Sequence, residues 1–219
     1  MIGGGETVMF WSDLSAVNLI EGSFTTATST TNPIIASSAV GKYLPAAKIG
    51  GGNFIYVWSG GFGGPSSAGQ GQDAACVTSR DGQNYLGIEA ITGLGSGGVT
   101  SGNSPGLTVQ QAYAIDSKVD DGNPQYGNVR ALFLNFAIGW DTPLWVAGGG
   151  AVGASAYSSP GKYAPTTAAT PGSSTTCYDN STAASGTPGV AGTTQHYSLE
   201  ISGGANVNCA LSFKMQAGD

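Results

Sequence analysis

The sequence predicts an α+β fold: a mostly antiparallel β-sheet with short helices and long loops rich in Gly, Ser and Thr. The chain has 37 Gly and 10 Pro among 219 residues, which is typical of a turn-rich β protein. Several runs are β-branched or aromatic, and two others have helical periodicity. Only 9% of the residues are charged and the formal net charge is −6. Disorder needs a higher net charge, so we expect a folded chain.

The first half of the chain predicts one helix and two strands. Residues 8–20 predict a short amphipathic helix that ends at Gly22, with Val8, Trp11, Leu14 and Val17 on one side. The Ser/Thr-rich residues 23–39 have little periodicity and predict a loop or an irregular edge. Residues 53–59 are apolar on both faces and predict a buried strand, and residues 85–91 predict a second one. Residues 60–71 predict a loop.

Residues 108–121 predict the second helix. Thr108 and Gln111 have the spacing of a capping box, and Leu107 and Ala112 have that of a hydrophobic staple. Gly122 is a good residue for a helix end, and the pair Asn123-Pro124 prevents the helix from continuing.

The last part of the chain predicts three more strands. Residues 128–139 give the longest strand pattern, and two apolar faces predict a central position in the sheet. Residues 195–202 and 208–216 predict the final two strands, joined by a turn at Gly203-Gly204. Between them and the long strand, residues 155–194 predict a surface excursion.

Three acids crowd the end of the second helix. Asp120 and Asp121 lie where the helix dipole disfavours anions by up to about 1 kcal/mol each, and Asp116 lies one turn earlier on the same face. The carboxylates could cap backbone N–H groups of the turn at 121–127, pair with Lys118 or Arg130, or hold a cation. A calcium ion at Asp116, Asp120 and Asp121 is the third alternative, although calcium prefers six to eight oxygen ligands. None of the three makes a catalytic acid pair.

Three segments resemble one protein family. The run from Ile115 to Val129, IDSKVDDGNPQYGNV, resembles a segment in the globular parts of bacterial type IV pilin-like (prepilin-type) proteins. Phe10–Gly22 is similar to their short helix of the pattern FWxxLxxAxLIxG, and Cys177-Tyr178 with Cys209–Gln216 is similar to their closing pattern. The motifs occur in the family's order and bracket nearly the whole chain. The residues that carry the central motif are Asp116, Lys118, Asp120, Asp121, Gly122, Pro124 and Gly127.

The resemblance implies a single pilin-like globular domain over residues 1–219. It implies a structural subunit of an extracellular filament or a pseudopilus, which acts by assembly and not by catalysis. Its partners would be other pilin subunits, in a homo- or hetero-polymer. It would lie in a cell-surface filament, or at the periplasmic face of the inner membrane before assembly.

The sequence departs from the family in one respect, because it contains no apolar run of the roughly 18 residues that span a membrane. Family members carry a hydrophobic amino-terminal helix that anchors them and builds the filament core. The opening residues 2–6 look like the tail of a Gly-rich loop that precedes the Phe10-Trp11 helix. We expect the hydrophobic helix to have been trimmed, or to come from a separate chain. Contact with a membrane is expected only through that helix.

The three cysteines allow one disulfide and one remaining thiol. The residues alone leave every pairing of Cys76, Cys177 and Cys209 open, as well as three reduced thiols. The resemblance implies Cys177–Cys209, and this bridge would stabilise the fold by roughly 3–4 kcal/mol in the chain-entropy model. Cys76 would then be a buried, inert thiol.

Other function classes find less support. An adhesin or carbohydrate-binding module is the alternative, with Tyr56 and Trp58, or Trp140 and Trp145, as a sugar-stacking platform, although core packing is the simpler interpretation of aromatic residues in strands. The seven Lys and Arg are scattered, so we expect no nucleic-acid partner.

An enzyme is not expected either. His196 is the one histidine and lies in a predicted strand with no nucleophile motif beside it. The GxGxxG pattern at 93–98 does not open a helix, so we expect no dinucleotide site. No cofactor is expected besides the calcium alternative.

Overall fold

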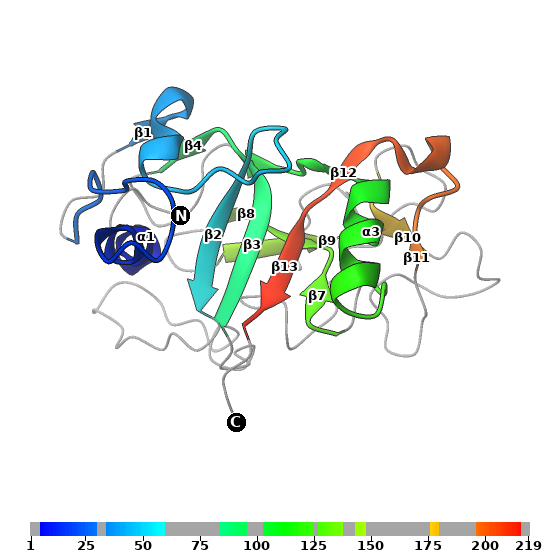
Figure 1. The fold of residues 1–219 in the computed structure, drawn as a ribbon. Helices are drawn as coiled ribbons and strands as arrows, with labels where there is room; N and C mark the ends of the chain where they lie inside the picture. The colour runs from blue at the N-terminus through cyan, green and yellow to red at the C-terminus, as the bar shows by residue number, and fades with distance from the viewer. Residues whose placement is uncertain are drawn as a thin grey trace, which may run out of the picture.

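In the computed structural model (Figure 1), the described residues are 5–29, 34–59, 84–95, 103–124, 127–137, 143–147, 176–179 and 196–215. Only the backbone is described for 58, 59, 103, 132–137, 143–147 and 179. Short helices combine with antiparallel strand pairs in these parts, so the α+β class is confirmed. The predicted loop at 60–71 and most of the excursion at 155–194 lie outside the described residues, as does Cys76.

The largest sheet has five strands, in the order β2-β3-β13-β7 with β5 paired to the far end of β3. Their bounds are β2 Asn53–Ser59, β3 Asn84–Ile91, β5 Asn103–Ser104, β7 Val129–Arg130 and β13 Leu211–Lys214. The strands predicted at 53–59 and 85–91 are β2 and β3, and they pair along the whole of β2.

The burial predicted for the first of these strands holds in part: Asn53 and Tyr56 are buried, whereas Phe54, Ile55 and Val57 are half-buried. Among the described strands β2 lies at the edge of the sheet. Its free edge is partly covered by a neighbouring loop. The Ile55 N–H donates to the Pro45 carbonyl at 2.9 Å, and the Ala47 N–H donates to the Asn53 carbonyl at 2.9 Å. An apolar strand can therefore lie at the edge, since a loop takes up part of its backbone hydrogen bonding.

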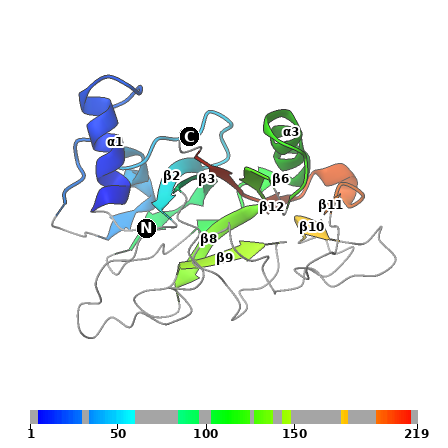
Figure 2. The same cartoon turned by 90° about the horizontal axis from the view of Figure 1, so that it is seen from below.

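The register divides the sheet into two faces, because residues directly opposite each other on paired strands point to the same side. We call one side the inner face. Five of its side chains are buried, namely Tyr56, Tyr85, Glu89, Ile91 and Ser212. Phe54, Arg130 and Lys214 lie on the same side and are half-buried. The pair β8 (Leu132–Ala137) and β9 (Pro143–Ala147) packs on one side of the sheet, opposite the two helices (Figure 2). This second layer accounts for the burial of the inner face.

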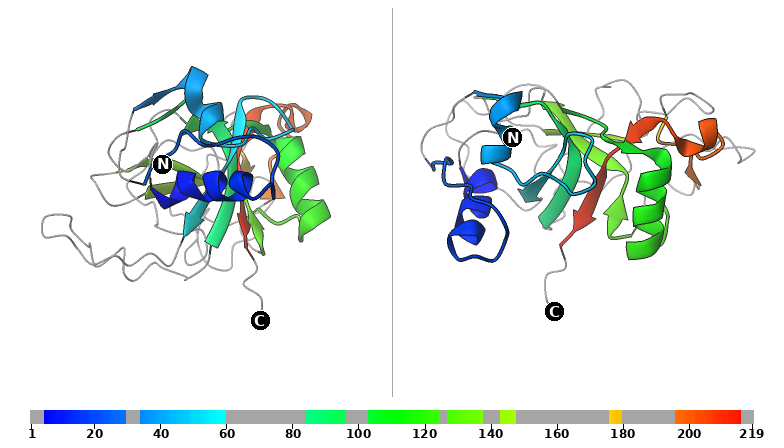
Figure 3. Two further views of the ribbon diagram at one scale, coloured as in Figure 1. Left: turned by 60° about the vertical axis from the view of Figure 1, so that its left-hand side comes forward. Right: turned by 45° about the horizontal axis from the view of Figure 1, so that its top comes forward.

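Two helices flank the other side of the sheet. Helix α1 (Glu6–Ala16) contacts the β2 edge and helix α3 (Val109–Val119) contacts the β7 edge (Figures 1 and 3). The capping box of α3 is confirmed: the Gln111 N–H donates to Thr108 Oγ1 at 3.0 Å, and the Thr108 N–H donates to Gln111 Oε1 at 2.9 Å. No helix within the described parts of the chain is both long and apolar enough to cross a membrane.

Helix α1 ends earlier than Gly22, the residue that the sequence pattern favours. The Leu19 N–H donates to the Leu14 carbonyl at 2.9 Å and the Asn18 N–H donates to the Ser15 carbonyl at 3.1 Å. Asn18 has a φ of 56°. This is a Schellman motif with Asn in the left-handed position. As a result Val17 is 63% exposed and does not extend the apolar face of the helix.

The single strand predicted at 128–139 is wrong, because the chain forms two separate strands there. Residues 129–130 pair with β13 as β7, whereas β8 begins at Leu132 and pairs with β9. The break is at Ala131, which is buried and donates its N–H to the Pro124 carbonyl at 2.9 Å. That hydrogen bond takes Ala131 out of the ladder and sends the chain into the second layer.

The final two predicted strands are shorter than expected and do not pair with each other. Strand β11 (His196–Tyr197) pairs with β10 (Tyr178–Asp179), and β12 (Val207–Cys209) pairs with β6 (Leu107–Thr108), whereas β13 joins the large sheet. The predicted turn at Gly203-Gly204 takes the form of the short 3-10 helix η2 (Ser202–Gly204). On the other side of the molecule, β1 (Ile35–Ala36) pairs with β4 (Gly93–Leu94), and the 3-10 helix η1 (Ser37–Lys42) follows β1.

Candidate functional site

The turn after α3 carries the central motif, and its acids have defined hydrogen-bond partners. Asp116 is fully buried in the last turn of the helix. Its Oδ2 atom accepts from the Tyr197 hydroxyl at 2.8 Å, and its Oδ1 atom accepts from the Gly122 N–H at 3.2 Å. The side chain therefore ties the helix both to β11 and to the turn that follows it.

Burial is the largest influence on the pKa values of Asp116 and Tyr197. It raises the pKa of Asp116 to about 6; the hydrogen bonds from Tyr197 and Gly122 oppose the shift, and the neighbouring Asp121 and Asp120 add to it. Burial, and next the Asp116 carboxylate, also raise the pKa of Tyr197 far above its ordinary value. The phenol therefore stays protonated and remains the donor in the pair.

Asp120 holds the two ends of the turn together. Its Oδ2 atom accepts from the N–H groups of Asn128 and Val129, the second at 3.1 Å. Gly127 makes this approach possible, because its φ is 76° and an added Cβ would overlap Asp120 Oδ2. A glycine is required at this position both for the backbone conformation and for the space.

Asp121 is exposed, and its Oδ1 atom accepts from the Asn123 N–H at 2.8 Å. All three acids thus accept hydrogen bonds from backbone N–H groups. Asp116 and Asp121 cap the turn at 121–127, which is the first of the three alternatives, whereas Asp120 accepts from the two residues just after that turn. These bonds explain how anions can lie at the carboxyl end of a helix, since each satisfies a donor that the turn would otherwise leave without a partner.

The other motif residues lie around the same turn. Lys118 is exposed on α3, and Pro124 is buried and accepts the hydrogen bond from Ala131. Arg130 donates through Nε to the Gly127 carbonyl at 3.3 Å. The seven motif residues are therefore brought together as one structural unit that connects α3 to β7.

The calcium site at Asp116, Asp120 and Asp121 stays a prediction. Carboxylate oxygens of Asp116, Asp120 and Asp121, one from each, lie within 4.8 Å of one another. Three such oxygens are fewer than the six to eight that calcium prefers, and each carboxylate already accepts a backbone hydrogen bond. Carbonyl groups or water would have to supply the remaining ligands.

The disulfide joins Cys177 to Cys209, which is the pairing that the resemblance implies. Both cysteines are buried. Because Cys177 adjoins β10 and Cys209 ends β12, the bridge fixes β10 and β11 to the strands beside α3. It therefore supports the side of α3 on which Tyr197 meets Asp116.

A second candidate surface was not predicted from the sequence, and we call it the outer face. It is the side of the sheet opposite the β8–β9 layer. Its side chains at the β2 side are apolar but only partly buried, and they are Ile55, Val57, Leu86, Ile88 and Phe213. The same face is closed near α3, where Leu211 and Val129 are buried.

Helix α3, which packs beside β7, carries an apolar strip of its own. Ala112, Ile115 and Val119 follow one another at intervals of three and four residues and so lie along one flank of the helix. Burial decreases along that flank, since Ala112 is buried, Ile115 is half-buried and Val119 is 62% exposed. The alternation of Leu86, Ile88 and Ala90 in β3 was the available signal for an apolar face. The partial exposure of the outer face depends on how the helices and strands pack together, and no sequence pattern indicates it.

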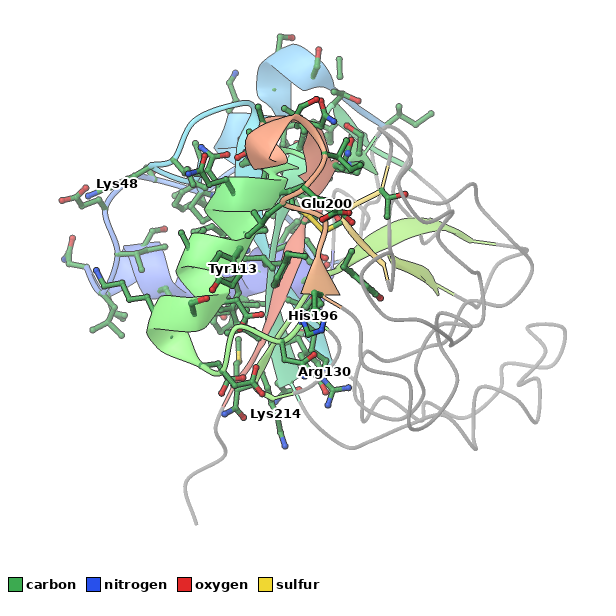
Figure 4. All side chains as sticks on the ribbon, turned by 90° about the vertical axis from the view of Figure 1, so that its right-hand side faces the viewer. Lys48, Tyr113, Arg130, His196, Glu200 and Lys214 are labelled. Atoms are coloured by element: carbon green, nitrogen blue, oxygen red, sulfur yellow. A yellow bond between two sulfur atoms is a disulfide. The ribbon has the colours of Figure 1, made fainter. Side chains whose placement is uncertain are left out.

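The residues considered for other functions are separated or buried. His196 lies in a strand, β11, as predicted, and is exposed; Figure 4 shows it on the same side of the molecule as Tyr113 and Arg130. Tyr56 is fully buried, so a sugar-stacking platform that includes Tyr56 is wrong. Trp140 and the side chains of Trp58 and Trp145 lie outside what is described. Of the pattern at 93–98, residues 93–94 form β4 and residues 96–98 are not described.

No family model, no curated protein and no solved structure matches this chain.

Proposed function

We propose that this chain is the globular domain of a structural subunit in an extracellular type IV pilus-like filament or pseudopilus. It acts by assembly and not by catalysis. Its partners are other pilin subunits, or a separate chain that carries the hydrophobic helix. The proposal combines the three sequence motifs with one structural observation, the half-buried apolar surface of the outer face.

The composition of the outer face supports an apolar partner. Ile55, Val57, Leu86, Ile88 and Phe213 form a continuous set across three neighbouring strands, and all five are half-buried, whereas most of the described side chains of the inner face are buried. Antiparallel sheets that face water on one side usually place polar residues there. Aliphatic and aromatic residues in those positions instead favour a surface that another element covers.

The width of this surface supports a single helix as the covering element. Three adjacent strands span about 10 Å between the axes of the outer two, and an α-helix with its side chains is about 10–12 Å across. Helices α1 and α3 flank the sheet on either side (Figure 2). One further helix between them would bury the outer face and also reach Val119.

The acidic turn supports assembly in a different way. Asp116, Asp120 and Gly127 hold the segment between α3 and β7 in one conformation. A rigid loop can make lateral contacts between subunits at a low cost in conformational entropy. In this proposal the turn presents a fixed surface to neighbouring subunits, while the hydrophobic helices supply the cohesion.

The experiment is filament assembly by the protein with its natural upstream segment, followed by electron microscopy and by shearing of surface fractions. Three variants are compared: Ile88→Glu on the outer face, Val119→Glu at the rim of that face, and Ala114→Glu as the control. Ala114 is exposed on α3 and lies on the opposite side of the helix from its buried residues Val109, Ala112 and Asp116.

We expect the control to assemble and both outer-face variants to fail, because an ionised Glu opposes burial against an apolar helix. Val119→Glu covers the case in which Ile88→Glu does not fold: Val119 is 62% exposed, so we expect the isolated domain to fold with a charge there. Normal filaments from a folded Val119→Glu and a folded Ile88→Glu variant would overturn the proposal. Loss of assembly by the control as well would also count against it.

The gene upstream of Met1 offers an independent test. A Gly-Phe-type cleavage site followed by about twenty apolar codons is the expected result for a filament subunit. A separate adjacent gene that encodes such a helix would fit the two-chain form. An upstream region with neither would contradict the proposal and favour a surface-displayed adhesin, which glycan binding by the isolated domain would then reveal.

A further inference from the structure

We draw no further inference here: the strongest candidate, the cluster of Asp116, Asp120 and Asp121 at the carboxyl end of α3, is an acidic cluster whose carboxylates already accept backbone hydrogen bonds, and no second observation among the described residues points to a ligand there.

Discussion

The Tyr197 hydroxyl donates a hydrogen bond of 2.8 Å to the buried carboxylate of Asp116, across 81 residues of sequence. This contact joins α3 to β11, and β11 is held in turn by its pairing with β10 and by the nearby disulfide. The acidic motif is therefore anchored to the closing segment of the chain. Tyr197 also pairs with Tyr178 across β10 and β11, so this contact connects the acidic turn with the segment that contains Cys177.

Tyr197→Phe should destabilise the fold, because it leaves a buried carboxylate oxygen without its donor. We expect a loss of about 1–3 kcal/mol in the free energy of unfolding, measured by chemical denaturation. Tyr113→Phe is the matched control, since the Tyr113 ring also contacts Tyr197 but is 41% exposed. The control should change stability by less than about 0.5 kcal/mol. Equal effects of the two substitutions would show that the hydrogen bond contributes nothing.

The ionisation of Asp116 should make stability depend on pH. Its pKa is about 6 in the folded protein and 3.8 as the ordinary value for an unfolded chain. Between these two pH values the folded protein still holds the proton that the unfolded chain has released. Raising the pH through this window therefore favours unfolding, so stability should fall from about pH 4 to about pH 6 and then level off.

Asp116→Asn isolates this contribution, because it removes the titrating group and retains a side chain of similar shape. Urea denaturation at a series of pH values should show a smaller loss of stability between pH 4 and pH 6 in the variant than in the native protein. Parallel pH profiles for the two proteins would mean that another group is responsible.

Gly127→Ala should be among the most damaging substitutions of a surface glycine. The left-handed backbone costs about 1–2 kcal/mol for any L-residue, and the clash with Asp120 Oδ2 adds about 1–3 kcal/mol as overpacking does in cores. Gly203→Ala separates the two terms, since Gly203 has a φ of 61° but open space around an added Cβ. Thermal unfolding of both variants gives the difference. If Gly127→Ala and Gly203→Ala lose the same amount of stability, the space between Gly127 and Asp120 does not limit which residue can stand at position 127.

The disulfide should carry a large share of the stability. Replacing Cys177 and Cys209 together by Ser opens a loop of 32 residues in sequence separation, and the chain-entropy model predicts a loss of about 3–4 kcal/mol. Denaturation of the native protein with and without reductant should give a similar difference. Cys76→Ser is the control, and it should leave both the bridge and the stability intact. A mass-spectrometric map that places Cys76 in the bridge would contradict the assignment.

The sequence predicts the local features of the fold well. Thr108 and Gln111 form their capping box with neighbours three residues away, and β2 and β3 follow from β-branched and aromatic runs. Asn18 was missed as a helix end because Gly22 is the more usual residue for a left-handed position, whereas the chain uses the asparagine four residues earlier.

The remaining differences come from contacts between distant residues. The break at Ala131 depends on the Pro124 carbonyl, and the separation of β11 from β12 depends on pairing with β10 and β6. The pairing of Asp116 with Tyr197 is of the same kind, since neither residue has a local signal for the other. The exposure of the outer face depends most on distant contacts, because it is set by the positions of the β8–β9 layer and of helices α1 and α3.

Photo-crosslinking from the outer face tests the central claim most directly. A benzophenone amino acid replaces Ile88 in the protein with its natural upstream segment, and Ala114 is replaced in the same way as the control. After illumination of intact surface filaments, we predict that mass spectrometry finds position 88 linked to an apolar helical peptide, from the same subunit or from a partner chain. Position 114 should form no such link. A folded, exported protein whose position 88 forms no crosslink, or links only to its own sheet, would contradict the account.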